Sequence, residues 1–459
     1  MFLTPTGDPN MRVSIIEAVA RIKRNVAACL SESAIEAACA AVAYAWRERE
    51  LGPVQTVWTF LTQVLHGNTA CEHAIRLTGL SCSASAYCQG RRRLPLAIFQ
   101  RLLEDTTRAA RRTLRQALWH GHRTFWVDGS STSMADTPEL QLHFGQSGQQ
   151  RSGCGFPVAR LWAMFDARSG LLVKLLVSPL RTHEGSQAAR FHPELRGGDV
   201  IVGDRAFASY VHLALLSRQK LHGLFPAHQR QLVSFRQDRK LRGKQPKGTV
   251  ALYANSRLIR KLGKYDQLVE YSKPRSRPEW MSAEEFAELP ATLVVRELRF
   301  RTKVKGCRAR EITLVTTLVD AETYPADELI ALYRTRWGIE TNFGHLKTTM
   351  GMDVLRCQTV AGVLKELHVF ALVYNLARLV MLASANEQRV PLERVSFVAA
   401  LRWLAAPPPC GTPLILPLNP ARPNRYEPRV RKRRPKEYPL MNSPRCQLRQ
   451  RLVTKKVRA

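Results

Sequence analysis

Four polar side chains recur at helical spacing in one segment of the chain. The set comprises Tyr333, Arg336, Glu340 and Lys347. On an α-helix of about 100° per residue, these side chains fall within roughly 60° of one another. Such a stripe is a poor core face, because buried charges need partners. It is either a solvated face with local ion pairs or a carboxylate held among phosphate-binding cations, and the second interpretation requires further carboxylates.

Two aspartates supply such carboxylates. Asp128 follows the strand-like segment Thr124–Val127 and precedes a polar turn, and Asp204 follows the buried-type strand 200–203. Each aspartate alone is more often structural, but ligand sites on open sheets tend to lie at strand ends. With Glu340 they form an all-oxygen set that favours magnesium or manganese over zinc. Two such ions can activate an attacking oxygen and stabilise the leaving oxygen of a phosphodiester.

Net charge identifies the class of partner. The chain of 459 residues has 70 Lys and Arg against 37 Asp and Glu, a formal net charge of +33. We therefore expect a polyanion, above all nucleic acid, bound with strong salt dependence. No apolar run reaches the roughly 18 residues of a membrane span, and the N-terminus does not resemble a signal peptide. Ten scattered cysteines without a C-x-x-C pair favour cytosolic thiols.

The elements that must position these side chains divide the chain into five segments. The predicted fold class is α/β, with a mixed core interrupted by a β-rich insertion. A helical N-terminal domain precedes the core and a basic, proline-rich tail follows it. The boundaries are 1–119 for the helical domain, 120–226 and 326–406 for the core, 227–325 for the insertion and 407–459 for the tail.

Two basic segments are candidates for DNA contact outside the core. A helix-turn-helix-sized unit, 71–93, ends in Arg91, Arg92 and Arg93, which suit phosphate or groove contacts. A structural helix tipped with arginines is an equally good interpretation. Residues 421–459 hold 14 Lys and Arg, and we expect this part of the tail to be extended until it meets a polyanion.

These residues together resemble a known family. The spacing Tyr333-x2-Arg336-x3-Glu340-x6-Lys347 is similar to the Tyr-Arg-Glu-Lys signature of bacterial insertion-sequence transposases of family four, in the DDE superfamily. WVDGSS and VGDRAF, the segments around the two aspartates, resemble the catalytic-aspartate blocks of that family. The resemblance covers nearly the whole chain. It implies a ribonuclease-H-like catalytic core with a β-strand insertion before the glutamate helix.

The resemblance also implies residue roles. Asp128, Asp204 and Glu340 would be catalytic and would bind two magnesium or manganese ions. The residues expected to contact the transposon-end strand are Tyr333, Arg336 and Lys347. Support for a base flipped out during hairpin formation is expected from Trp337 and Trp280. Core packing is an equally good interpretation of Trp280.

The function implied is cut-and-paste DNA transposition. The resemblance implies that the protein excises double-stranded DNA at inverted-repeat ends through a hairpin intermediate and joins the ends to target DNA. It would act as a homodimer in the bacterial cytoplasm, associated with the nucleoid. Two alternatives stay open: a catalytically inactive DNA-binding derivative, and a ribonuclease-H-like nuclease without strand joining. The repeat sequence, the target preference and the region that recognises the ends are not specified by the sequence.

Overall fold

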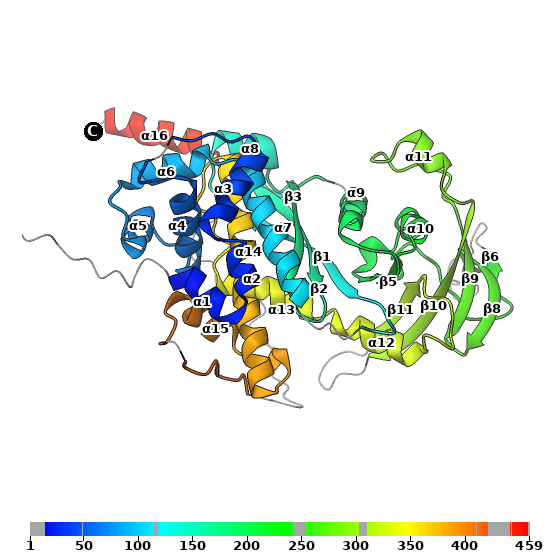
Figure 1. The fold of residues 1–459 in the computed structure, drawn as a ribbon. Helices are drawn as coiled ribbons and strands as arrows, with labels where there is room; N and C mark the ends of the chain where they lie inside the picture. The colour runs from blue at the N-terminus through cyan, green and yellow to red at the C-terminus, as the bar shows by residue number, and fades with distance from the viewer. Residues whose placement is uncertain are drawn as a thin grey trace, which may run out of the picture.

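The computed structural model describes residues 14–47, 49–113, 118–182, 184–241, 253–302, 310–409, 411–420, 441 and 443–457. A body of helices lies beside a long mixed sheet (Figure 1). The N-terminal helices are α1 Ser14–Ile22, α2 Arg24–Ala28, α3 Glu32–Ala41, α4 Pro53–Leu65, α5 Cys71–Thr78, α6 Ala84–Arg93 and α7 Leu96–Thr113. Helices α5 and α6 are joined through Gly79, which has a left-handed φ of 65° and ends α5.

The described strands form one nine-stranded sheet and a two-stranded ribbon. The order in the large sheet is β3-β2-β1-β4-β5-β11-β10-β9-β8. Its strands are β1 Thr124–Ser133, β2 Val158–Asp166, β3 Leu172–Pro179, β4 Val200–Val202, β5 His222–Pro226, β8 Arg257–Gly263, β9 Asp266–Ser272, β10 Thr292–Thr302 and β11 Arg310–Thr316. The ribbon pairs β6 Lys240–Leu241 with β7 Tyr253–Ala254.

Strand direction separates the sheet into two parts. Strands β1, β2 and β3 are antiparallel neighbours, whereas β4 and β5 run parallel to β1. Strand β11 then pairs antiparallel with β5, so the strands of the insertion continue the same sheet. Backbone hydrogen bonding between neighbouring strands is therefore continuous from the edge strand β3 to the edge strand β8, across both the core and the insertion.

Helices lie on both faces of the first part of the sheet. The helices that follow β1 in the chain are α8 Pro138–Phe144, α9 Glu184–Ala188, α10 Tyr210–Arg218, α11 Ala283–Ala287, α12 Ala326–Thr335, α13 Gly338–Gly344, α14 Val360–Gln388, α15 Phe397–Ala405 and α16 Arg445–Val457. Along β1, Trp126 joins the apolar cluster that contains α13 and α14, whereas Phe125 and Val127 join the cluster that contains α10. This alternation is the period of two that places successive side chains on opposite faces.

Helix α14 forms the centre of the helical body. Among the described residues it is the one helix long and apolar enough to cross a membrane, and 89% of its most apolar window is buried inside the protein. It contacts α4, α7, α15 and β3. A helix that is apolar on all sides and enclosed in this way is a core helix.

Three local predictions differ from the structure. The polar segment after Asp128 is not a turn, because 129–133 continues β1 and pairs with β2. The Tyr333 segment is not one regular helix: α12 ends at Thr335, α13 begins at Gly338, and a π-helix occupies His345–Thr349. The tail is helical over α16, while 421–440 lies outside the described residues.

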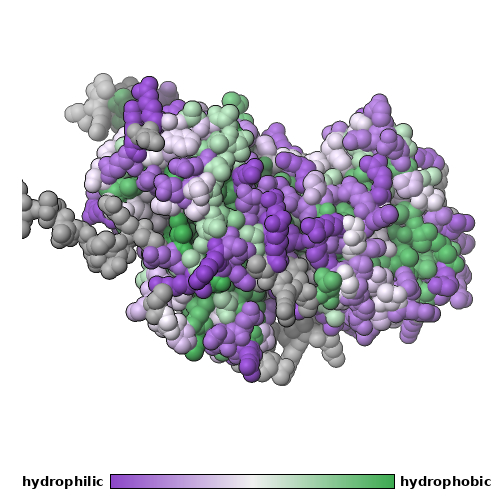
Figure 2. Space-filling view, in the orientation of Figure 1, coloured by the Kyte–Doolittle hydropathy of each residue, from purple (hydrophilic) through white to green (hydrophobic). Residues whose placement is uncertain are grey.

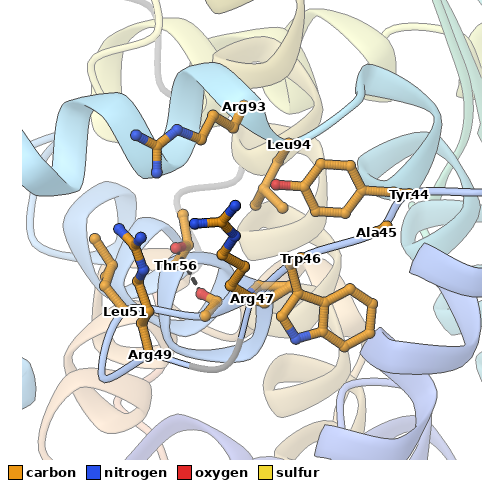
Figure 3. A pocket seen from close by; sticks show the side chains of 12 residues that line it. Tyr44, Ala45, Trp46, Arg47, Arg49, Leu51, Thr56, Arg93 and Leu94 are labelled. Atoms are coloured by element: carbon orange, nitrogen blue, oxygen red, sulfur yellow. Dashed lines mark hydrogen bonds between the residues drawn. The ribbon is translucent and has the colours of Figure 1, made fainter.

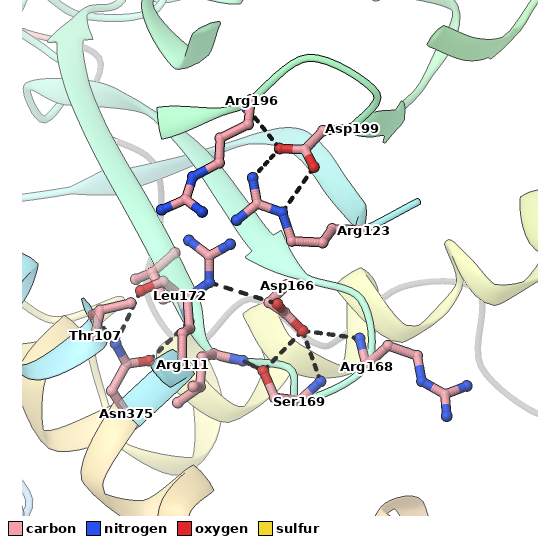
Figure 4. Close-up of polar contacts among 11 residues, drawn as sticks. Thr107, Arg111, Arg123, Asp166, Arg168, Ser169, Leu172, Arg196, Asp199 and Asn375 are labelled. Carbon is pink, nitrogen blue, oxygen red and sulfur yellow. Dashed lines mark hydrogen bonds and ion pairs between the residues drawn. The ribbon is translucent and has the colours of Figure 1, made fainter. Parts of the chain in front are cut away.

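A tight turn joins β2 to β3. The Gly170 amide donates to the Asp166 carbonyl at 2.8 Å, and Gly170 has a φ of 67° that favours glycine. The Asp166 carboxylate accepts from the Arg168 amide and from the amide and hydroxyl of Ser169 (Figure 4). These bonds satisfy a buried carboxylate locally, as in other turns that begin with Asp.

The edge of the sheet at β3 is closed by a side chain of α14. The Asn375 side-chain amide accepts from the Leu172 amide at 2.8 Å and donates to the Leu172 carbonyl at 2.9 Å (Figure 4). It also donates to the Thr107 hydroxyl on α7 at 3.0 Å. Asn375 thus gives an edge strand the partners that a further strand would otherwise supply.

Replacing Asn375 by leucine should lower the free energy of unfolding by about 2–4 kcal/mol, because two buried backbone groups of Leu172 lose their partners. Urea denaturation measures the change. Asn386→Leu is the matched control, since Asn386 is exposed near the end of the same helix, and it should change stability by less than about 0.5 kcal/mol. Equal effects of the two substitutions would contradict this role of Asn375.

Candidate functional site

Strand register brings the two aspartates together. Trp126 on β1 pairs in parallel with Val202 on β4, and Asp128 and Asp204 each lie two residues further along. With a period of two, each aspartate points to the same face as the residue two positions before it. Trp126 and Val202 both belong to the cluster on the α13 and α14 side. The carboxylates therefore emerge side by side on that face.

Trp126 also fixes the segment that carries the other polar side chains. Its indole nitrogen donates to the Thr335 hydroxyl at 3.1 Å, at the end of α12. Gly338, the first residue of α13, lies against the indole ring: a Cβ on Gly338 would be only 2.5 Å from the nearest ring atom. A helix former at 338 would therefore push α13 away from β1, which explains a glycine that is otherwise unfavourable in a helix.

Between these two contacts the backbone is tighter than an α-helix. The amides of Arg336, Trp337 and Glu340 donate to carbonyls three residues earlier in the chain. Such i to i−3 bonds are typical of 3₁₀ turns at helix junctions. The four side chains of the expected stripe therefore lie on three helical segments and the junction between α12 and α13, rather than on one helix.

Two cations of that stripe contact β1. The Arg336 guanidinium donates to the Asp128 carboxylate at 3.1 Å. The Lys347 ammonium donates to the Ser131 carbonyl at 2.8 Å and to the Ser130 hydroxyl at 3.3 Å. Sequence reasoning placed Ser130 and Ser131 in a turn and did not assign them to the site. The sequence feature that could have assigned them to the site is their position directly after Asp128 and Gly129.

Electrostatics shows that the carboxylates share one environment. Burial, and then the charge of Asp204, raise the pKa of Asp128 to about 6. This value includes a smaller increase from the charge of Glu340 and decreases from the Gly129 amide and Arg336. Asp204 also caps the following turn, because its carboxylate accepts from the Ala206 amide at 2.9 Å. Negative charges therefore gather where a bound cation would relieve their repulsion.

The three carboxylates are not equally close. In the part of the chain that the structure describes, no three acidic, histidine or cysteine side chains lie near enough to hold one metal ion together. Asp204 affects the pKa of Asp128 more than Glu340 does, and Glu340 is exposed. The structure thus pairs the two aspartates and leaves Glu340 at the rim of the site.

The aromatic candidates differ in exposure. Trp337 is 68% exposed, beside Arg336 at the helix junction. Tyr333 is half-buried, with its ring edge-on to Phe300 and 5.9 Å from the Arg336 guanidinium carbon. Trp280 packs partly buried against an apolar cluster from α10 and the insertion, as the core-packing interpretation expected.

The arginines at the end of α6 also differ from one another. The Arg91 guanidinium lies within the helical body, donating to the Gln63 side chain at 3.0 Å and packing over the rings of Phe60 and Tyr87. Arg91 is therefore engaged in packing, which corrects the expectation that all three arginines are presented to DNA. Arg92 and Arg93 are exposed. Figure 2 shows further hydrophilic side chains over the middle of the molecule, between the helices and the sheet.

Comparisons with known proteins identify the family of the chain. The family model described as "Transposase DDE domain" matches residues 119–376, a segment that includes Asp128, Asp204 and Glu340. The chain is 26% identical over 305 residues to the transposase InsG for insertion sequence element IS4 of Escherichia coli K12. That alignment covers 66% of this chain and 62% of InsG. InsZ of the same strain is 29% identical over 148 residues, which are 31% of this chain and 49% of InsZ.

The chain thus spans less than two thirds of the length of either relative. Among solved structures, a synaptic complex of piggyBac transposase with hairpin DNA is similar with a TM-score of 0.43 and 10% identity, over 86% of this chain and 78% of that one. The family match covers more than half of the sequence and contains the whole paired-aspartate site. The protein belongs to the transposase DDE domain family, as its resemblance to insertion-sequence transposases of family four predicted.

Proposed function

We propose that the protein is a DNA transposase that excises DNA at inverted-repeat ends and joins the freed ends to target DNA. The observation that carries the proposal is the register of β1 and β4, which sets Asp128 beside Asp204 under a helix junction that supplies Arg336 and Glu340. Carboxylates beside phosphate-binding cations are the groups that phosphodiester chemistry requires.

A ribonuclease-H-like core is part of this proposal. It is supported by the first five strands, which form the order 3-2-1-4-5 with an antiparallel meander followed by two parallel strands. The insertion lies between β5 and the helices that carry Glu340. We further propose that double-stranded DNA is the substrate, that two copies pair the two ends, and that the protein acts in the bacterial cytoplasm at the nucleoid.

The donor set fits divalent metal ions. Asp128, Asp204 and Glu340 offer oxygen ligands of the kind that magnesium and manganese prefer, and two of them already repel each other across the site. Bound divalent ions would activate the attacking oxygen and neutralise charge on the scissile phosphate. Glu340, now at the rim, would complete the set of ligands.

The basic and aromatic side chains would then orient the DNA strand. Arg336, which pairs with Asp128 in the structure, can turn to a backbone phosphate once a cation takes its place beside the carboxylate. Lys347 is held against β1 and would neutralise a neighbouring phosphate. The exposed ring of Trp337 offers a stacking surface for an unpaired base, as formation of a hairpin would require.

One observation favours a second function, DNA binding without cleavage. In the described part of the chain, the carboxylates lie too far apart to hold one ion together. Such a separation is expected in a DNA-binding protein that no longer cleaves DNA. A nuclease without strand joining is a third candidate. The products formed from an end bearing the inverted repeat separate the three: shifted but uncut DNA, cut DNA, or cut and joined DNA.

Glu340→Gln should lower metal-dependent cleavage of such an end by about 10²–10³-fold or more, because a carboxylate that balances the bound cations is lost. Gel analysis of labelled DNA with magnesium measures both cleavage and joining. Glu387→Gln, an exposed glutamate on α14, is the control and should cut normally. Full cleavage by Glu340→Gln would remove this residue from the mechanism.

Two glycines of α13 test whether the Trp126 contact positions the site. Gly338→Ala places a methyl group against the Trp126 ring and should reduce cleavage at least about tenfold while DNA binding is retained. Gly344→Ala, where nothing lies within 4 Å of the new Cβ, should cut normally and be more stable by about 0.5–1 kcal/mol. Cleavage rates, binding and thermal midpoints of the two variants give the comparison. Loss of activity in both, or in neither, would refute the positioning role.

A further inference from the structure

A basic pocket with two aromatic walls lies in the helical body, apart from the paired aspartates. Its volume is about 290 Å³. It lies between the connection from α3 to α4 and the end of α6 (Figure 3). The side chains that give it its character are Tyr44, Trp46, Arg47, Arg49 and Arg93. The described residues that line it include three arginines and no acidic residue.

The local backbone brings these groups together. Ala43 has a left-handed φ of 51° after the end of α3, which turns the chain into the segment that carries Tyr44 and Trp46. Gly90 on α6 allows the close approach from the other side, because a Cβ there would be 3.1 Å from both the Leu51 side chain and the Thr56 hydroxyl. That approach sets the end of α6, with its exposed arginine, at the rim of the pocket (Figure 3).

Among the described residues, the arginines of the pocket have no acidic partner. Arg47, Arg49 and Arg93 are exposed, and no described acidic side chain forms an ion pair with them, whereas ion pairs on α5 and α7 engage other arginines. The nearby Glu50 carboxylate accepts from the Ser81 amide at 2.8 Å instead. Neighbouring guanidinium groups repel one another unless an anion binds between them, and the planar guanidinium group suits phosphate.

The aromatic walls add a second kind of recognition. The rings of Tyr44 and Trp46 are stacked, with centroids 6.3 Å apart and planes inclined by 16°. Trp46 is 36% exposed, so its ring remains accessible beside the arginines. Phosphate-binding cations next to a stacking surface are the combination that binds single strands, because bases within a duplex are stacked on one another and cannot reach such a ring.

We propose that this pocket binds a nucleotide of an unpaired DNA strand, with the phosphate held by Arg47, Arg49 and Arg93 and the base stacked on Trp46. This assignment goes beyond the proposed chemistry, because it concerns a separate surface and requires no cleavage. It gives the helical body a preference for opened over paired DNA.

The experiment uses the full-length protein without divalent metal and fluorescent oligonucleotides: a single strand, the matching duplex, an abasic strand and the matching RNA. Replacing the three arginines by glutamine should weaken single-strand binding at least tenfold and reduce the slope of log affinity against log salt by about 2. The control replaces Arg24, Arg101 and Arg112, which are exposed elsewhere on the helical body, and it should change both quantities much less. Equal losses in the two triple variants would overturn the proposal.

Trp46→Ala tests the base contact. It should weaken binding of the normal single strand about tenfold and leave the abasic strand unchanged, and Trp46→Phe should restore most of the loss. An equal effect on both strands, or tighter binding of RNA than of DNA, would overturn the assignment. Thermal midpoints confirm that the variants fold. Because metal is absent, failure here leaves the cleavage proposal standing, and failure of cleavage leaves this binding measurable.

Discussion

The site depends on one contact, the indole of Trp126 against the start of α13. This side chain occupies the position on β1 that pairs with Val202 and precedes Asp128 by two residues. Its nitrogen holds Thr335 and its ring requires a glycine at 338. One residue therefore fixes the position of the helix junction relative to both aspartates. The distance between the acidic and the basic side chains follows from this packing rather than from their charges.

Charge distribution is the second constraint. The chain has a large excess of cations, yet its site gathers acids, and burial together with their mutual repulsion raises the pKa of Asp128. Arg336 partly balances their charge. A basic exterior attracts a polyanion from a distance, while the carboxylates of the site offer oxygen ligands of the kind that divalent cations prefer. The basic surface and the carboxylates of the site lie in separate places. A high positive net charge is therefore compatible with an acidic centre.

Much of this was readable from the sequence, and the exceptions have physical causes. The strands around Asp128 and Asp204, the turn at 166–170 and the long apolar helix follow from local pattern and turn chemistry. The extension of β1 beyond Asp128 was missed because residues 129–133 are small and polar, and it is their pairing with β2 that makes them a strand. The interior position of Arg91 was missed because adjacent arginines look alike in sequence, although a helix sends them in different directions.

Continuity between core and insertion gives the sheet only two ends, and they are protected differently. At β3 the side-chain amide of Asn375 occupies both backbone groups of Leu172, so another strand cannot pair at that residue. At β8 the pairing with β9 is irregular, and the strand carries Arg257, Arg260 and Lys261. Irregular pairing and like charges oppose the addition of a second sheet. Both ends of the described sheet therefore oppose edge-to-edge polymerisation, even at a high local concentration of the protein.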